Sequence, residues 1–372
     1  MCLLTPIFTT HLTVSFELLL CERPWNSSIG RAHQMKGTNL SATTVSRLRE
    51  NTVGAGGLHN FDLSNSNTGP KELALIAECV KFNAQNVEGV APLISIDFSG
   101  NHICGVDFLM SGTPDHSGVH ELVNALNGIG GKSRLKKINF SRNYLDLKAF
   151  STIGHMIGSG IQSLSELSLR DCCATDDAIA KLMDGLKHAK SLQILDLSHN
   201  KIGLEGCEAI ADALTMTTKL KQISLAECDI GPAGTFSIMK GMGSNISVEA
   251  MFYGDNNFGD EGAEAVASML KVNTRLKHLD LQENSIGPKG MEEISAALKV
   301  NRVLIFLNLQ WNELGNNATV SLCEALAVNN VLKSVHILGT QIDADGIRRM
   351  LDSSIDKKFD VDLAFAAAAP AV

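Results

Sequence analysis

Short runs with the residue types of a phosphate or calcium site occur at three places in the chain. Gly131-Lys132-Ser133 has the ending of a phosphate-binding loop, in which backbone N–H groups and a lysine hold the phosphates. Such a loop needs a glycine where Leu126 stands and a preceding strand, whereas this run follows an expected helix. Residues 255–259 and 343–346 have the Asp and Gly of a calcium loop, but not its sixth-position glycine or final glutamate. All three runs are better explained as turns.

Histidine and cysteine form no catalytic or metal-binding pattern. The eleven histidines include no pair at metal-ligand spacing, and no serine or cysteine stands in a nucleophile motif. The nine cysteines, an odd number, run from Cys2 to Cys323 without a repeated short spacing, which predicts reduced thiols in an intracellular protein. We therefore expect a cytoplasmic, non-enzymatic chain with no cofactor and no metal.

The composition predicts a core of small aliphatic layers and a protein partner. Of the 372 residues, 44% are apolar and only 5% are aromatic. The net charge of −8 disfavours nucleic acid as a partner, because neutralising phosphates needs a basic face. We expect a basic or neutral protein partner, no membrane binding and a monomeric chain.

Residues 1–57 are irregular, and we expect them to form an N-terminal segment and cap. Residues 7–20 are apolar enough for a signal peptide, yet no Lys or Arg precedes them and His11 and Glu17 interrupt them. They are also too short to span a bilayer. A signal peptide, disorder, a capping segment and a true start at Met35 remain open alternatives.

A repeated frame of aliphatic residues occupies residues 58–350. Its best copy has Leu192, Leu195, Leu197, Asn200 and Ile202 at relative positions 1, 4, 6, 9 and 11. Seven copies follow one another every 28 residues and three looser ones precede them, which gives ten repeats. Their first residues are Leu58, Leu93, Leu135, Leu164, Leu192, Leu220, Val248, Leu276, Leu304 and Leu332.

The first half of each repeat predicts a strand over positions 3 to 7, with positions 4 and 6 buried and positions 3, 5 and 7 facing outward. Position 9 is Asn in six copies, and its amide is expected to satisfy backbone groups of the turn inside the stack. Cys172 and Cys228 fit the same slot as small buried hydrophobes, while Ser66 and Thr340 replace Asn in the two terminal copies.

The second half of each repeat predicts a helix. Gly287 and Pro288 mark one helix start, because proline suits the first helical position. Helices are wider than strands, so stacking predicts a horseshoe with a parallel concave sheet and helices on the convex side. The residues expected to face the sheet at helical spacing are Met291, Ile294, Ala297 and Leu298 in one copy and Ala209, Ala213 and Leu214 in another.

The frame over residues 58–350 resembles the ribonuclease-inhibitor class of leucine-rich repeats, an α/β solenoid. This class includes Ran GTPase-activating proteins and the recognition domains of cytosolic immune receptors. The resemblance implies a protein-binding scaffold, since members share the fold and differ in what they bind. A GTPase activator and an inhibitor or recognition module are the alternatives. The Ran activators end in a strongly acidic tail, which the alanine-rich residues 365–372 do not match.

The frame also predicts an acidic concave face, because outward positions 3, 5, 7 and 8 carry nine acidic and three basic residues, a net charge of −6. Such a face attracts a basic partner. The acidic residues are Asp62, Asp97, Glu166, Asp171, Asp196, Glu227, Asp255, Asp280 and Glu283, and the basic residues are Lys137, Arg142 and Arg170.

Large aromatic residues occur at outward positions near the C-terminal end, where their side chains would not contribute to the core. We predict a partner-binding anchor formed by Phe252, Phe306 and Trp311 and flanked by Asp255, Asp280 and Glu283. The insertion at residues 104–134 is either a binding loop or neutral padding before a helix over 119–126. Residues 351–372 are expected to form a C-terminal cap and tail, with an edge strand around Val361.

Overall fold

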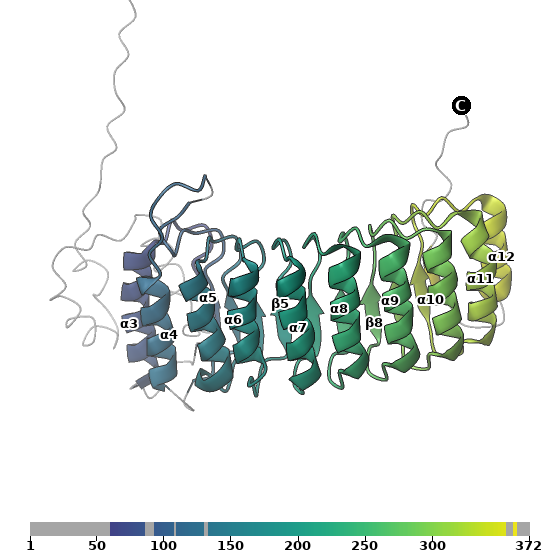
Figure 1. The fold of residues 1–372 in the computed structure, drawn as a ribbon. Coiled ribbons are helices and arrows are strands. Elements are labelled where there is room, and N and C mark those ends of the chain that lie inside the picture. The colour runs from purple at the N-terminus through teal and green to yellow at the C-terminus, as the bar shows by residue number, and fades with distance from the viewer. Residues whose placement is uncertain (1–59, 86–92, 108, 130–132, 355–359, 363–372) are drawn as a thin grey trace, which may run out of the picture.

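The computed structural model describes residues 60–85, 93–107, 109–129, 133–354 and 360–362. Within these ranges, strands and helices alternate along the chain, and the strands form one parallel sheet covered by a single layer of helices (Figure 1). The described sheet has eleven strands in the order of the sequence. The predicted α/β solenoid is confirmed.

Neighbouring strands pair in register, so equivalent positions of successive repeats lie side by side, as Asp196, Ser224 and Phe252 do. The first ten strands begin the ten predicted repeats. The eleventh strand is the edge strand expected around Val361. The strands are β1 (Asn60–Asp62), β2 (Ser95–Asp97), β3 (Lys137–Asn139), β4 (Glu166–Ser168), β5 (Ile194–Asp196), β6 (Gln222–Ser224), β7 (Ala250–Phe252), β8 (His278–Asp280), β9 (Phe306–Asn308), β10 (Ser334–His336) and β11 (Asp360–Asp362).

One helix follows each of the strands β1 to β10, and a π-helical turn over Met156–Gly160 continues α5. Gly287 caps α10 and Pro288 is its first residue, as predicted. No described helix is both long and apolar enough to cross a membrane. The helices are α3 (Pro70–Gln85), α4 (Ser117–Ile129), α5 (Leu147–His155), α6 (Asp176–Leu186), α7 (Leu204–Met216), α8 (Gly231–Ser244), α9 (Gly259–Val272), α10 (Pro288–Val300), α11 (Gly315–Val328) and α12 (Ala344–Ser354).

The strands are shorter than predicted, because they span positions 3 to 5 and not 3 to 7. In β5, the Oδ1 atom of Asp196 accepts a hydrogen bond from the N–H of Ser198 at 3.0 Å. This local bond satisfies the first N–H group beyond the strand on that side, and strands without such a side chain, such as β7, end at the same position. His199 then has a φ of +58°, which turns the chain away from the sheet.

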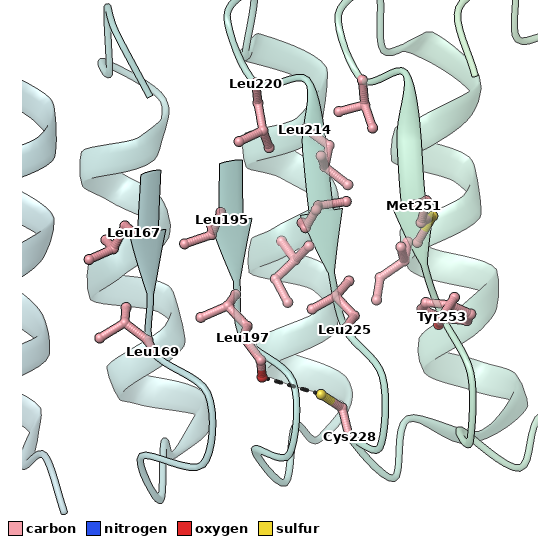
Figure 2. Packing of buried hydrophobic residues seen from close by; sticks show 14 of the residues in the cluster. Leu167, Leu169, Leu195, Leu197, Leu214, Leu220, Leu225, Cys228, Met251 and Tyr253 are labelled. Atoms are coloured by element: carbon pink, nitrogen blue, oxygen red, sulfur yellow. Dashed lines mark hydrogen bonds between the residues drawn. The ribbon is translucent and has the colours of Figure 1, made fainter. Parts of the chain in front are cut away.

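The core lies between the sheet and the helices, and Figure 2 shows its repeated leucine layers. Leu195 and Leu197 are fully buried, and the predicted inner face of α10 is buried as well. On α7 the predicted Ala209 is only partly buried, and Ile210 is fully buried in its place. The buried face of α7 therefore includes Ile210, which follows the expected Ala209 in the sequence.

An asparagine ladder runs through the turns after the strands, as predicted for position 9. The Nδ2 group of the buried Asn284 donates to the carbonyl oxygen of Tyr253 at 2.9 Å, and its Oδ1 accepts the N–H of Asn256 at 2.8 Å. The N–H of Asn284 donates in turn to Oδ1 of Asn312 at 3.0 Å. Asn284 therefore ties three consecutive repeats together and satisfies buried backbone groups.

Cys228 occupies the same slot without an amide. Its N–H donates to Oδ1 of Asn256 at 3.1 Å, and its Sγ donates to the carbonyl oxygen of Leu197 at 3.4 Å (Figure 2). Burial raises the pKa of this thiol to about 12, so it stays protonated and able to donate. Cys172 makes the equivalent bond to Phe140 at 3.3 Å. The predicted structural role of both cysteines is confirmed.

A second asparagine ladder follows the C-terminal ends of the helices and was not predicted. Nδ2 of Asn301 donates to the carbonyl oxygen of Leu270 at 2.8 Å, and its Oδ1 accepts the N–H groups of Val303 and Leu304. The sequence signal is a Val-Asn pair at 272–273, 300–301 and 328–329, which lies outside the leucine frame.

The insertion after the second repeat forms a loop that stands out from the turn edge of the solenoid (Figure 1), and the expected helix follows as α4. Oδ1 of Asp107 accepts the N–H groups of Leu109 and Ser111, both at 2.9 Å, which orders the loop tip. Leu109 is 85% exposed there.

Candidate protein-interaction surface

The open side of the sheet, opposite the helices, carries the side chains at positions 3 and 5 of each repeat. In β5, Ile194 and Asp196 are partly exposed, whereas Leu195 between them is fully buried against the helices. We term this side the concave face. Positions 5 to 10 of the repeats, at the ends of the strands, form the strand-end rim. Position 3 and the four residues before it form the strand-start rim.

Position 8 has a left-handed backbone conformation in every described repeat. At Asp255, Glu283 and Trp311 the φ angles are +54°, +53° and +57°. The backbone N–H of each donates to a carbonyl oxygen of the next repeat, as Trp311 does to Leu338 at 2.8 Å. The turn thus fixes the backbone and leaves the side chain on the outer surface. The ten residues are Asn65, Gly100, Arg142, Asp171, His199, Glu227, Asp255, Glu283, Trp311 and Gly339.

A groove on the strand-end rim brings three of the predicted site residues together. We term it the Trp311 groove. It crosses three repeats, holds three carboxylates and one aromatic ring, and has no Lys or Arg among its lining residues. These are Asp255, Asn257, Glu283, Ser285, Trp311 and Glu313. Glu313 was not predicted, because its position 10 is not among the outward positions of the predicted strand.

Trp311 is the largest side chain in this groove. It is 56% exposed, and its indole ring lies against Gly339 of the next repeat. A left-handed conformation costs a residue with a Cβ about 1–2 kcal/mol, and glycine avoids that cost. Glycine occupies the equivalent positions 100 and 339, so the turn itself does not require a tryptophan.

The other predicted site residues lie on the strands outside the Trp311 groove. Phe252, at the end of β7, is 38% exposed and borders a broad hollow that extends across the concave face to β2. Phe306, in β9, is half-buried between His278 and His336, with ring centroids 6.0 Å and 4.8 Å away. The three predicted aromatic residues are thus spread across the concave face and its rim.

Asp280, in β8, pairs with Phe252 on one side and with Asn308 on the other. Burial raises the pKa of its carboxyl group, while hydrogen bonds from the Gln282 N–H and the Asn308 side chain partly offset the shift. Oδ1 of Asp280 lies 3.1 Å from the backbone nitrogen of Gln282.

Asp62, Asp97 and Asp196 make the same turn bond to the residue two positions later. Together with Asp280, four of the nine acidic side chains predicted for the concave face therefore also cap strand ends. Their presence follows partly from the needs of the turn.

A basic cluster on the strand-start rim was not predicted, because positions 28 and 2 of the frame lie outside the predicted outward positions. Glu249 is the centre of this cluster. Its carboxylate lies 3.0 Å from Nζ of Lys221, 2.7 Å from Nζ of Lys277 and 3.5 Å from Nη2 of Arg275. Hydrogen bonds from Lys277 and Lys221 lower the pKa of Glu249 to about 2.

The short runs that resemble phosphate or calcium sites have structural roles wherever they lie within the described residues. Oδ1 of Asp343 accepts the N–H of Gly346 at 2.8 Å, which caps the start of α12. Asp255 and Asn257 are turn residues with positive φ. Gly131 and Lys132 lie outside the described residues. No group of three or more His, Cys, Asp or Glu in the described part of the chain is arranged to hold a metal ion.

Three segments of the chain, residues 188–211, 254–267 and 272–295, match the family model described as Leucine Rich repeat. With the observed strand and helix alternation, this match identifies the fold as a leucine-rich-repeat solenoid. No curated protein matches the chain.

Several solved structures are similar to this chain. The leucine-rich repeat-containing protein LegL7 from Legionella pneumophila has 16% identity and a TM-score of 0.43, over 75% of this chain and 81% of that one. The tropomodulin C-terminal domain of Caenorhabditis elegans has 15% identity and a TM-score of 0.36, over 40% and 90%. Actin-Binding Site 2 of leiomodin-1 has 24% identity and a TM-score of 0.32, over 36% and 79%.

Proposed function

We propose that this leucine-rich-repeat chain is a non-enzymatic protein-interaction module whose partner binds the concave face and presents basic side chains to the Trp311 groove. The observation that carries the proposal is Trp311 itself. Its ring is 56% exposed, its backbone is left-handed, and it shares a groove with the carboxylates of Glu283 and Glu313.

An arginine or lysine of a partner fits this groove chemically. A cation over an indole ring gains about 0.5–2 kcal/mol, depending on how far the pair is removed from water. The carboxylates would pair with the same cation, and an acidic rim also speeds the encounter with a basic partner. Large aromatic residues and arginines are the groups that most often dominate the affinity of protein interfaces.

Quantitative affinity capture tests this proposal. Full-length wild type, Trp311→Ala and Phe236→Ala are used as baits, and bound proteins are compared by mass spectrometry. Phe236, on α8, is 63% exposed on the helix layer, and therefore controls for loss of any exposed aromatic ring. We expect a specific partner that Trp311→Ala reduces at least tenfold and Phe236→Ala leaves unchanged. Equal recovery with all three baits contradicts the proposal.

A further inference from the structure

Charge is divided across the concave face in the four repeats of β6 to β9. Their strand-end rim carries six acidic side chains and no Lys or Arg. The acidic residues are Glu227, Asp229, Asp255, Asp280, Glu283 and Glu313. Their strand-start rim carries five basic side chains and one acidic one. These are Lys219, Lys221, Arg275, Lys277 and Arg302, with Glu249.

The acidic side chains of the strand-end rim are mostly exposed, although Glu227 already lies 2.7 Å from Nε2 of His199. Five of the six are exposed, and Asp280 is half-buried. Asp229 pairs with Lys201 at 3.3 Å, but the two side chains are 67% and 86% exposed, so this pair contributes little stability. A partner cation that displaces such a contact therefore replaces a weak interaction.

The strand-start rim keeps a positive charge even after its internal pairing. Three cations, Lys221, Arg275 and Lys277, surround the single carboxylate of Glu249. This arrangement holds the cations in a row along β6 to β8 and leaves a net charge of +2 within the cluster. Lys219 and Arg302 extend the basic row and are exposed.

Apolar side chains stand at strand positions that are inward of the charged residues on two of these repeats. Phe252 and Phe306 stand on β7 and β9, within the strands and between the basic and acidic ends. Ala250 begins β7 on the same face as Phe252. Along β9 the surface changes from the basic Arg302, through Phe306, to the acidic Glu313. The outward positions of β6 and β8 are polar or charged, and Glu249 precedes β7.

The dimensions of this surface match an α-helix that lies across the strands. Positions 2 to 6 of a repeat, around the extended strand, span roughly 13 Å at about 3.3 Å per residue, and a helix with its side chains is about 10–12 Å wide. Neighbouring strands are about 4.8 Å apart, close to the helical pitch of about 5.4 Å. Residues three or four apart on a helix would therefore meet successive repeats.

We infer that the partner element that binds β6 to β9 is an amphipathic helix with an apolar stripe, flanked by basic side chains on one side and acidic side chains on the other. The basic flank faces the Trp311 groove, and the acidic flank faces Lys221 and Lys277. A helix with basic residues on both flanks would place cations against these lysines. This inference rests on the proposed function and adds the chemistry of the partner.

Three synthetic helical peptides of equal length and apolar stripe test the inference. One has a lysine flank and a glutamate flank, the second has two lysine flanks, and the third has two glutamate flanks. Circular dichroism verifies equal helicity, and fluorescence anisotropy measures binding to the full chain. We expect the mixed peptide to bind at least tenfold tighter than either of the others.

Variants of the two rims locate the binding. Asp255→Asn with Glu283→Gln and Glu313→Gln is expected to remove the advantage of the mixed peptide over the glutamate-only peptide. Lys221→Gln with Lys277→Gln is expected to reduce its advantage over the lysine-only peptide. A mixed peptide whose binding neither set of substitutions changes is bound elsewhere, and this result overturns the inference.

Failure of the inference is distinguishable from failure of the proposed function. If the lysine-only peptide binds as tightly as the mixed one, the two-sided partner is excluded while a basic partner is retained. If no peptide binds, the helical partner is overturned, and capture with the Trp311→Ala bait still decides whether the groove binds a protein.

Discussion

The indole ring of Trp311 lies against Gly339, the residue at the same position one repeat later. Gly339 has a φ of +72°, and a Cβ built on it would collide with the ring. The placement of the tryptophan therefore depends on the absence of a side chain in the next turn. The two adjacent turns thus share one backbone conformation but have different roles. The first turn exposes the indole ring, and the second leaves space for it.

Gly339→Ala should destabilise the chain by about 1–2 kcal/mol, from the left-handed backbone alone, and should also displace the indole ring. Urea unfolding measures the first effect, and Trp fluorescence measures the second. Gly128→Ala is the control, because nothing lies within 4 Å of a Cβ at that helical position. Alanine there should be neutral or stabilising by up to about 1 kcal/mol. Equal effects at the two sites would contradict this account of Gly339.

The free energy of unfolding should be about 1 kcal/mol higher for Trp311→Gly than for Trp311→Ala. Both variants lose the same ring contacts, but only glycine adopts a φ of +57° without strain. Chemical denaturation of both variants checks this difference. Both should lose the captured partner to the same extent. A glycine variant less stable than the alanine variant would argue against backbone strain at Trp311.

Asn284→Ala should destabilise the solenoid by about 2–3 kcal/mol. The substitution leaves the buried N–H of Asn256 without its acceptor, which costs about 1–3 kcal/mol, and removes one of the two amide donors to the carbonyl oxygen of Tyr253, which keeps that of Asn256. Asn317→Ala, at an exposed position in α11, is the matched control and should change stability by less than about 0.5 kcal/mol. Similar losses at both positions would refute the ladder's role.

Asp280→Asn should stabilise the chain at neutral pH, because the pKa of Asp280 is raised by burial and its charged form is unfavourable in the folded state. Asparagine retains the oxygen that accepts the Gln282 N–H, as Asn308 does for Gln310 one repeat later. A raised carboxyl pKa means that wild-type stability falls as pH rises through it.

The gain from Asp280→Asn should therefore be larger at pH 7 than at pH 3. Thermal melts at both pH values measure it. Asp97→Asn, which keeps the corresponding bond to Ser99, controls for the change of side chain. An equal gain at both pH values for Asp280→Asn would contradict the burial effect.

Glu249→Gln should remove a pH dependence between about pH 4.5 and pH 2. The pKa of Glu249 is lowered from 4.5 to about 2, so its ion pairs stabilise the wild type above pH 4.5 and are lost as pH falls towards 2. Because these side chains are partly exposed, the expected difference at neutral pH is about 1 kcal/mol. Denaturation curves across this range should be flatter for the variant than for the wild type.

The repeat architecture was predictable because buried aliphatic residues recur at a fixed spacing that only a stacked strand and helix can satisfy. The strand ends were not predictable from that pattern, because they depend on the left-handed turn at position 8, which residues as different as Asp255, Trp311 and Gly339 adopt. The Asn301 ladder was missed for a related reason. Its residues mark hydrogen bonds between repeats and not the hydrophobic core.

For the candidate site, the frame predicted that Asp255, Glu283 and Trp311 face outward, and the structure places them in one groove. Two features needed the three-dimensional register. The contact between Trp311 and Gly339 depends on stacking of adjacent turns. The division of charge between the rims appears only when residues before and after each strand are assigned to opposite edges.

The asparagine ladder has a consequence for recognition as well as for folding. Because Asn256, Asn284 and Asn312 bind one another across successive turns, the turns cannot spread or close independently. The carboxylates of Asp255 and Glu283, each next to a ladder residue, therefore keep a fixed separation. The surface therefore favours a partner whose charges have a matching spacing. A partner of equal total charge but different charge spacing should bind more weakly.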